Sequence, residues 1–119
     1  MKSKDLRIGN YICKVALCPF QVTPHELSLM FRHEMTHGEH KDFSGIPLTE
    51  EMLLKCEYKE INGFYEIGRL TIDLNRDEHG DFKHSAFIKD SLIDDFNYLH
   101  ELQNIYYYTH KKQELKINL

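Results

Sequence analysis

The chain has 119 residues, the size of one domain with one hydrophobic core. We expect a single domain over residues 1–119, with a β-rich sub-region over 1–45 and an α+β sub-region over 46–119. Its 41% hydrophobic and 29% charged content is typical of globular proteins and argues against disorder. The net charge of −4 and the scattered Lys and Arg residues argue against nucleic-acid binding, because phosphates are neutralised by clustered cations.

The first predicted elements are short strands. Residues 6–12 predict a strand, or the start of one, with Gly9-Asn10 as turn residues. Residues 14–22 are apolar and β-branched, and Pro19 restricts them to a sheet edge or a bend because proline cannot donate a ladder hydrogen bond.

Residues 23–38 carry the signals of both a helix and a strand. The helix signals are an N-cap, a first-position proline, a capping-box glutamate and a terminal glycine: Thr23, Pro24, Glu26 and Gly38. The strand signal is the alternation of Leu27, Leu29 and Phe31 with their neighbours, although Leu27 and Phe31 also have helical spacing. The residue pattern alone favours the helix.

The middle of the chain predicts a short helix and a set of strands. Thr49 can cap a helix over residues 50–56, whose first two residues are acidic and favour the helix dipole. Strands are predicted at residues 57–61, 64–67, 69–74 and 82–88. Asn62-Gly63 lies between the first two and is a strong hairpin signal. Residues 75–81 read as a polar turn.

The C-terminal part contains the clearest helical pattern. Asp94 or Asp95 is the predicted N-cap of a helix over residues 96–109, with an apolar stripe at Leu99, Leu102 and Tyr106. Residues 114–119 alternate like a final strand. The order of elements predicts an α+β fold with mostly antiparallel pairing.

The cellular location is predicted from the absence of a targeting segment and of a membrane-spanning segment. No apolar targeting stretch follows the N-terminus, and no stretch is long enough for a membrane span. Cys13, Cys18 and Cys56 form no CxxC pair, so we expect small, buried or half-buried side chains rather than a disulfide framework or a thiolate zinc site. These features predict a cytoplasmic protein that does not bind membranes.

Four segments resemble a family of short uncharacterised proteins encoded in gut anaerobic bacteria and their prophages. They are residues 6–11, residues 46–54, Gly63-Phe64-Tyr65 leading into residues 70–72, and residues 98–106. The resemblance implies a small run of strands, similar to an SH3-like barrel, before residue 46, and so favours β structure over residues 14–31. This chain has Thr109-His110 where the family often has Thr-Gly, so its helix end can differ. The family has no established activity, so the resemblance implies no functional residues.

One string matches a metalloprotease motif, His33-Glu34-Met35-Thr36-His37. On a helix, His33 and His37 share a face and can bind one zinc ion, while Glu34 can act as general base on a zinc-bound water. This chemistry also needs a third ligand, for which His40, Glu50, Glu51 and Glu57 are candidates. None of them lies in a recognisable third-ligand motif, so a solvated polar segment is the favoured interpretation.

Other polar clusters are weaker candidates for a site. His100 and Asn104 lie one helical turn apart and can either bind a ligand or anchor the helix to neighbouring backbone. Tyr107 lies in a run of three tyrosines that can stack on bases or peptide side chains, or pack half-buried with wet hydroxyls. The acidic residues near the 75–81 turn lack the register of a calcium loop.

The sequence predicts an α+β protein with an N-terminal small SH3-like β-barrel or meander, a short helix, an antiparallel β-hairpin sheet and a C-terminal helix. The predicted function is that of a small non-enzymatic binding or accessory protein of phage or mobile-element origin, with a protein or peptide partner and no cofactor. The alternative is a zinc-dependent hydrolase that uses His33, His37 and Glu34. Nucleic-acid binding through the tyrosines is a third hypothesis, which the acidic balance disfavours.

Overall fold

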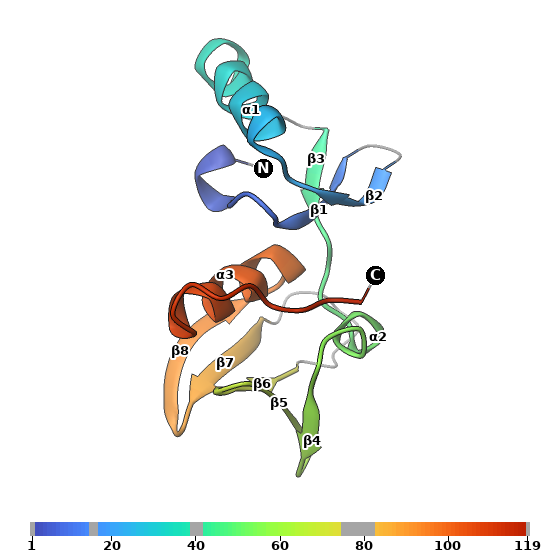
Figure 1. Cartoon of the computed structure of the whole chain (residues 1–119), viewed down its shortest axis with the longest axis vertical. Coiled ribbons are helices and arrows are strands. Elements are labelled where there is room, and N and C mark those ends of the chain that lie inside the picture. The colour runs from blue at the N-terminus through green and yellow to red at the C-terminus, as the bar shows by residue number, and fades with distance from the viewer. Residues whose placement is uncertain (1, 15–16, 39–41, 75–82, 119) are drawn as a thin grey trace. The chain divides into compact units, whose positions relative to one another are not determined.

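The computed structural model describes residues 2–14, 17–38, 42–74 and 83–118 (Figure 1). The chain divides into two compact units. Unit 1 comprises Met1–Pro47 and Tyr98–Asn104, and unit 2 comprises Leu48–Asn97 and Ile105–Leu119. Over the described ranges the strands form one antiparallel sheet in each unit, accompanied by helices. The predicted α+β class is therefore confirmed.

Unit 1 is built on a three-stranded sheet with the order β2-β1-β3. Its elements before the long helix are η1 (Ser3–Asp5, a 3₁₀ helix), β1 (Tyr11–Lys14) and β2 (Leu17–Gln21), and β3 (Phe43–Gly45) follows it. Both pairings to β1 are antiparallel. The described strands leave this sheet open, so the barrel implied by the resemblance is not formed by them.

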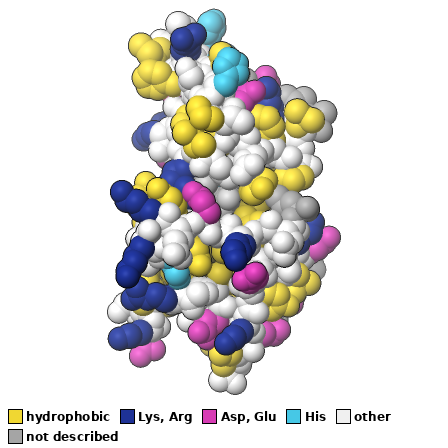
Figure 2. Space-filling view, viewed as in Figure 1, with side chains coloured by type: hydrophobic (Ala, Val, Ile, Leu, Met, Phe, Trp, Pro, Cys, Tyr) yellow, Lys and Arg dark blue, Asp and Glu magenta, His cyan; other side chains and the backbone are white. Residues whose placement is uncertain are grey.

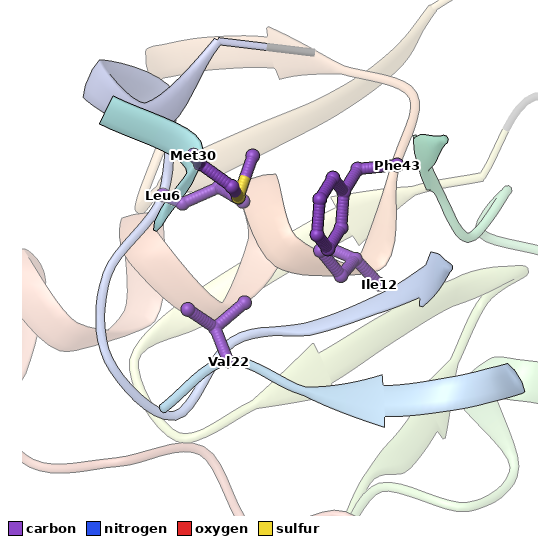
Figure 3. Packing of buried hydrophobic residues seen from close by; sticks show 5 residues of the cluster. All are labelled: Leu6, Ile12, Val22, Met30 and Phe43. Carbon is purple, nitrogen blue, oxygen red and sulfur yellow. The ribbon is translucent and has the colours of Figure 1, made fainter. Parts of the chain in front are cut away.

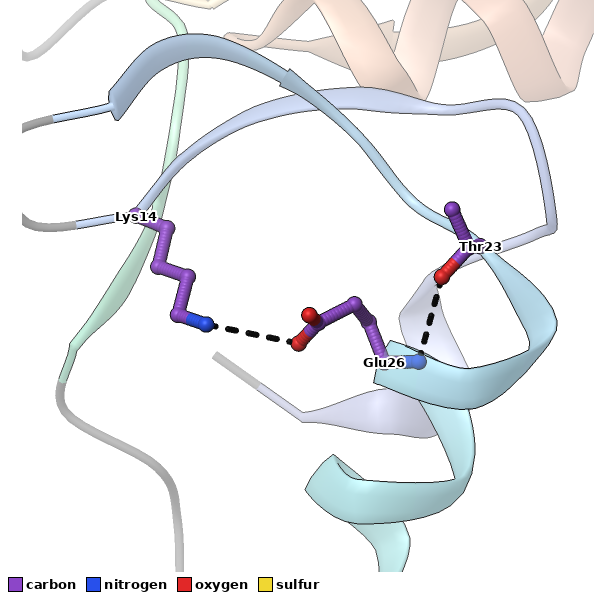
Figure 4. A network of polar contacts seen from close by, with 3 residues as sticks. All are labelled: Lys14, Thr23 and Glu26. Atoms are coloured by element: carbon purple, nitrogen blue, oxygen red, sulfur yellow. Dashed lines mark hydrogen bonds and ion pairs between the residues drawn. The ribbon is translucent and has the colours of Figure 1, made fainter.

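The segment with mixed signals is a helix, α1 (Pro24–His37). The Thr23 hydroxyl accepts a hydrogen bond from the Glu26 backbone N–H at 3.3 Å, and Gly38 ends the helix with φ 80°. The Glu26 carboxylate lies 3.4 Å from the Lys14 ammonium, which links the helix start to β1 (Figure 4). The predicted Thr23 N-cap and the terminal Gly38 are confirmed, whereas the Glu26 carboxylate contacts Lys14 in place of the predicted capping-box bond. The strand interpretation of this segment is wrong, because capping at both ends satisfies backbone groups that a helix leaves unpaired.

The core of unit 1 is a cluster of five buried side chains, which point toward one another in Figure 3: Leu6, Ile12, Val22, Met30 and Phe43. Met30 is the buried residue of α1, with Leu27 packed beside it. Full burial of a side chain of this size contributes about 1.5–3 kcal/mol. One face of the helix is thereby fixed on the sheet, and its other faces are left to solvent.

Unit 2 contains a five-stranded antiparallel sheet whose strands follow in sequence order. Its strands are β4 (Lys59–Ile61), β5 (Phe64–Ile67), β6 (Leu70–Asp73), β7 (His84–Ile88) and β8 (Ser91–Phe96), and α2 (Glu50–Leu53) precedes them. Asn62 and Gly63 have φ of 52° and 84°, so the predicted hairpin turn is confirmed. The predicted turn at residues 75–81 lies outside the described residues.

Three predictions for unit 2 and the last helix need correction. Asp94 and Asp95 lie in β8, where they pair with Ala86 and Ser85 of β7, and α3 (Leu99–Thr109) begins after them. Helix α2 ends at Leu53, earlier than predicted. The predicted final strand is reduced to a single bridge between Cys56 and Ile117.

The cysteines also differ from the prediction. Cys13 and Cys18 form a disulfide across the β1–β2 connection, so the expectation of unpaired thiols is wrong for this pair. Cys56 is a free thiol and is buried, as predicted. None of the helices in the described part of the chain has the length and apolarity that a membrane span requires.

Candidate functional site: an apolar groove beside α1

An open groove of about 660 Å³ lies in unit 1 between α1 and the N-terminal segment. From the N-terminal segment it is lined by Lys2, Ser3, Lys4 and Ile8, and from α1 by Pro24, Leu27, Ser28, Phe31 and Glu34. The five α1 residues recur at intervals of three, one, three and three, so they share one face of the helix. The groove is thus a consequence of the helix, and a strand would not bring these residues together.

The groove presents apolar side chains that the fold does not bury. Ile8 is 53% exposed and Phe31 is 56% exposed, while Leu27 between them is half-buried against the core. Figure 2 shows hydrophobic side chains exposed beside histidines on the surface formed by α1. Exposed apolar groups that line one concave surface are typical of a binding site, whereas single scattered ones are ordinary.

The charged residues of the groove are not balanced. Lys2 and Lys4 are exposed, and no described residue forms an ion pair with either. The Glu34 carboxylate accepts hydrogen bonds from the Ser3 backbone N–H and, at 2.7 Å, from the Ser3 hydroxyl. The lining therefore carries two ammonium groups against one carboxylate, a net positive charge in a chain of negative net charge.

The metalloprotease string lies on α1, with its histidines beyond the groove lining. The rings of His33 and His37 are stacked with centroids 5.0 Å apart, as residues one helical turn apart allow. The predicted general base, Glu34, is bound to Ser3. Among the residues that the structure describes, no three His, Cys, Asp or Glu side chains converge as metal ligands. His40, a candidate third ligand, lies outside them.

Asn104 is a structural anchor within unit 1. Its side-chain oxygen accepts hydrogen bonds from Arg7 Nε and Asn10 Nδ2, both at 2.9 Å, and its amide nitrogen donates to the Asp5 carbonyl at 3.1 Å. The neighbouring Gln103 accepts from the Tyr11 backbone N–H at 2.8 Å. These bonds hold the start of α3 against the chain's opening turn, as the anchoring interpretation predicts.

His100 is enclosed rather than presented to a ligand. Its ring is 4% exposed and stacks on Tyr98 with centroids 5.7 Å apart. Its Nδ1 atom is buried and makes no hydrogen bond with any described residue. Burial lowers the pKa of His100 below its ordinary value, and the charges of Glu101 and Asp5 oppose this shift. The side chain is therefore neutral near pH 7.

The three tyrosines on the last turns of α3 belong to unit 2 and differ in their exposure and in their ring contacts. Tyr107 is half-buried, with its ring edge-on to Tyr108 at 5.2 Å between centroids. Tyr106 stacks on His110 at 3.8 Å, and His110 Nε2 accepts a hydrogen bond from the Arg69 backbone N–H. Of the three, only Tyr108 is largely exposed, at 70%. Nucleic-acid binding through them stays the disfavoured third hypothesis.

The groove was missed by the sequence interpretation, although part of its signal was present. The helical spacing of Leu27 and Phe31 was visible, but the wall formed by Lys2, Lys4 and Ile8 depends on tertiary packing. Comparison with known proteins gave no match to a protein-family model, a curated protein or a solved structure. The groove geometry therefore carries the functional argument.

Proposed function

We propose that this chain is a small non-enzymatic binding protein that captures a segment of another protein in the groove beside α1. The observation that supports this most is the apolar lining, in which Phe31 of α1 and Ile8 of the turn before β1 are more than half exposed. Helix α1 is fixed by Met30 and its caps, so the groove is preformed and little ordering is needed on binding. The resemblance of the chain's sequence to short prophage-encoded proteins supports an accessory role.

The test is selection of peptides from a random displayed library against the folded protein. Phe31→Ser removes the largest exposed apolar side chain of the groove, and Met35→Ser is the matched control. Met35 is 73% exposed on the same helix but does not line the groove. We expect peptides that bind wild type and Met35→Ser and fail to bind Phe31→Ser. Peptides that bind all three proteins equally would contradict a groove-based function.

The zinc-dependent hydrolase is the alternative proposal, supported by the stacking of His33 and His37 on one helical face. The bonds from Ser3 to Glu34 weaken it, because a general base must reach the zinc-bound water. Metal analysis of untagged protein tests it: stoichiometric zinc that is lost in His33→Ala supports the hydrolase, and retention of metal in that variant opposes it.

A cytoplasmic location is likewise a proposal, and one feature of the chain bears on it. The Cys13–Cys18 disulfide opposes it, because the cytosol keeps most thiols reduced. Alkylation of free thiols in intact cells, followed by mass analysis, distinguishes a cytosolic location from an oxidising compartment. Cys13 and Cys18 that stay unlabelled indicate an oxidising compartment, and alkylation of both indicates the cytosol.

A further inference from the structure

The charge and the shape of the groove narrow the class of partner, and this step rests on the proposed function. The side of the groove formed by α1 runs from Pro24 to Glu34, which is ten helical steps and therefore about 15 Å at 1.5 Å per step. That length matches about three turns of a partner helix, or four to five residues of an extended peptide.

The lining favours the helical partner. An extended peptide needs a strand edge to satisfy its backbone N–H and C=O groups. Of the described lining residues, none belongs to a strand: they lie in α1, in or beside η1, and, for Ile8, in the turn before β1. A helix satisfies its own backbone and presents an apolar stripe of three or four side chains to such a floor.

The lysines that line the groove favour a partner helix with acidic residues beside its apolar stripe. Lys2 and Lys4 lie on the wall opposite α1, and they outnumber the single carboxylate of the lining, Glu34. A basic partner would meet two exposed ammonium groups that form no ion pair with any described residue, whereas an acidic partner would complement them. We infer that the groove binds an acidic amphipathic helix, with its apolar anchors against Ile8, Leu27 and Phe31 and its carboxylates facing Lys2 and Lys4.

Displayed peptides of roughly 16 residues are the probe, because shorter helices are marginal in water. We expect groove-dependent peptides, defined by loss of binding to Phe31→Ser, to have apolar residues three and four apart with Asp or Glu between them. Lys2→Glu/Lys4→Glu should weaken their binding roughly tenfold at low salt, and less at high salt because screening weakens exposed charge pairs. Lys55→Glu/Lys116→Glu is the matched control, since both lysines are exposed in unit 2 and the net charge changes equally.

The outcomes separate this inference from the function on which it rests. Groove-dependent peptides without acidic residues, or with prolines between their anchors, would overturn the inference and leave groove binding intact. A library with no groove-dependent peptide would overturn both. Vesicles of phosphatidylserine and phosphatidylcholine distinguish a membrane partner: binding to them that depends on Lys2 and Lys4, with no peptide enriched, would also overturn the acidic helix.

Discussion

The side-chain oxygen of Asn104 lies 2.9 Å from Arg7 Nε, which joins the first turns of α3 to a turn 97 residues earlier in the chain. The same oxygen accepts from Asn10, which is fully buried. Removal of this acceptor leaves the Asn10 amide donor without this partner and without access to water. A bond of this kind is therefore expected to matter more for folding than for ligand binding.

Asn104→Ala is predicted to lower the free energy of unfolding by about 2–3 kcal/mol, because unsatisfied buried donors retain their desolvation penalty. Urea denaturation of the variant measures this loss. Asn118→Ala is the control, since that side chain is exposed in unit 2. Equal midpoints for the two variants would show that the Asn104 bonds contribute nothing to stability.

Gly68 is predicted to be less tolerant of a side chain than Gly63. Both have positive φ, 57° and 84°, so alanine costs about 1–2 kcal/mol at either position. A Cβ at Gly63 meets open space, whereas a Cβ at Gly68 would lie 2.5 Å from Nε2 of His110. Thermal denaturation should therefore show a larger loss for Gly68→Ala, and His110→Ala should reduce the difference in the double variant.

Buried histidines predict that stability falls on acidification. Burial lowers the pKa of His100 and of His84 below the ordinary 6.5. The unfolded chain therefore takes up these protons at a higher pH than the folded chain does. Their contribution to stability is complete above about pH 6.5 and is lost as the pH falls through the lower folded pKa values.

Urea midpoints measured across this pH range test the prediction. His100→Leu removes one titrating group and should flatten the pH dependence, while His25→Gln removes an exposed imidazole and serves as the control. A midpoint that rises on acidification, or a slope unchanged in His100→Leu, would show that burial of His100 is not linked to stability.

The thiols are predicted to differ in reactivity. Burial raises the pKa of the Cys56 thiol to about 11, so it should resist iodoacetamide in the native protein near pH 8 and react once the protein is unfolded. Cys13 and Cys18 should react only after reduction, because they are paired. Mass spectrometry counts the labels. Rapid labelling of the native, oxidised protein would contradict both assignments.

Local sequence signals were sufficient where the structure is decided by neighbouring residues. Thr23 and Gly38 bounded α1, and Asn62-Gly63 set a hairpin, because caps and turns depend on backbone groups a few residues away. The local signal gave a wrong result at Asp94 and Asp95. Both are good N-cap residues, but pairing with β7 places them in a strand. Tertiary pairing overrides such propensities.

The candidate site could not be predicted because it is assembled from distant segments. Ser3 and Glu34 are 31 residues apart, and their hydrogen bonds bring η1 to α1 and form the groove wall. No period or motif encodes that contact. The motif that the sequence did show, residues 33–37, lies on a helix as zinc binding requires, yet its glutamate takes part in this structural contact.

The most direct test of the account is an NMR titration of ¹⁵N-labelled protein with one groove-dependent peptide from the library. We predict chemical-shift changes concentrated at Ser3, Ile8, Leu27, Ser28 and Phe31, with little change at His37 or in unit 2. Shifts centred on His33 and His37, or confined to unit 2, would contradict the claim that the groove beside α1 is the functional surface.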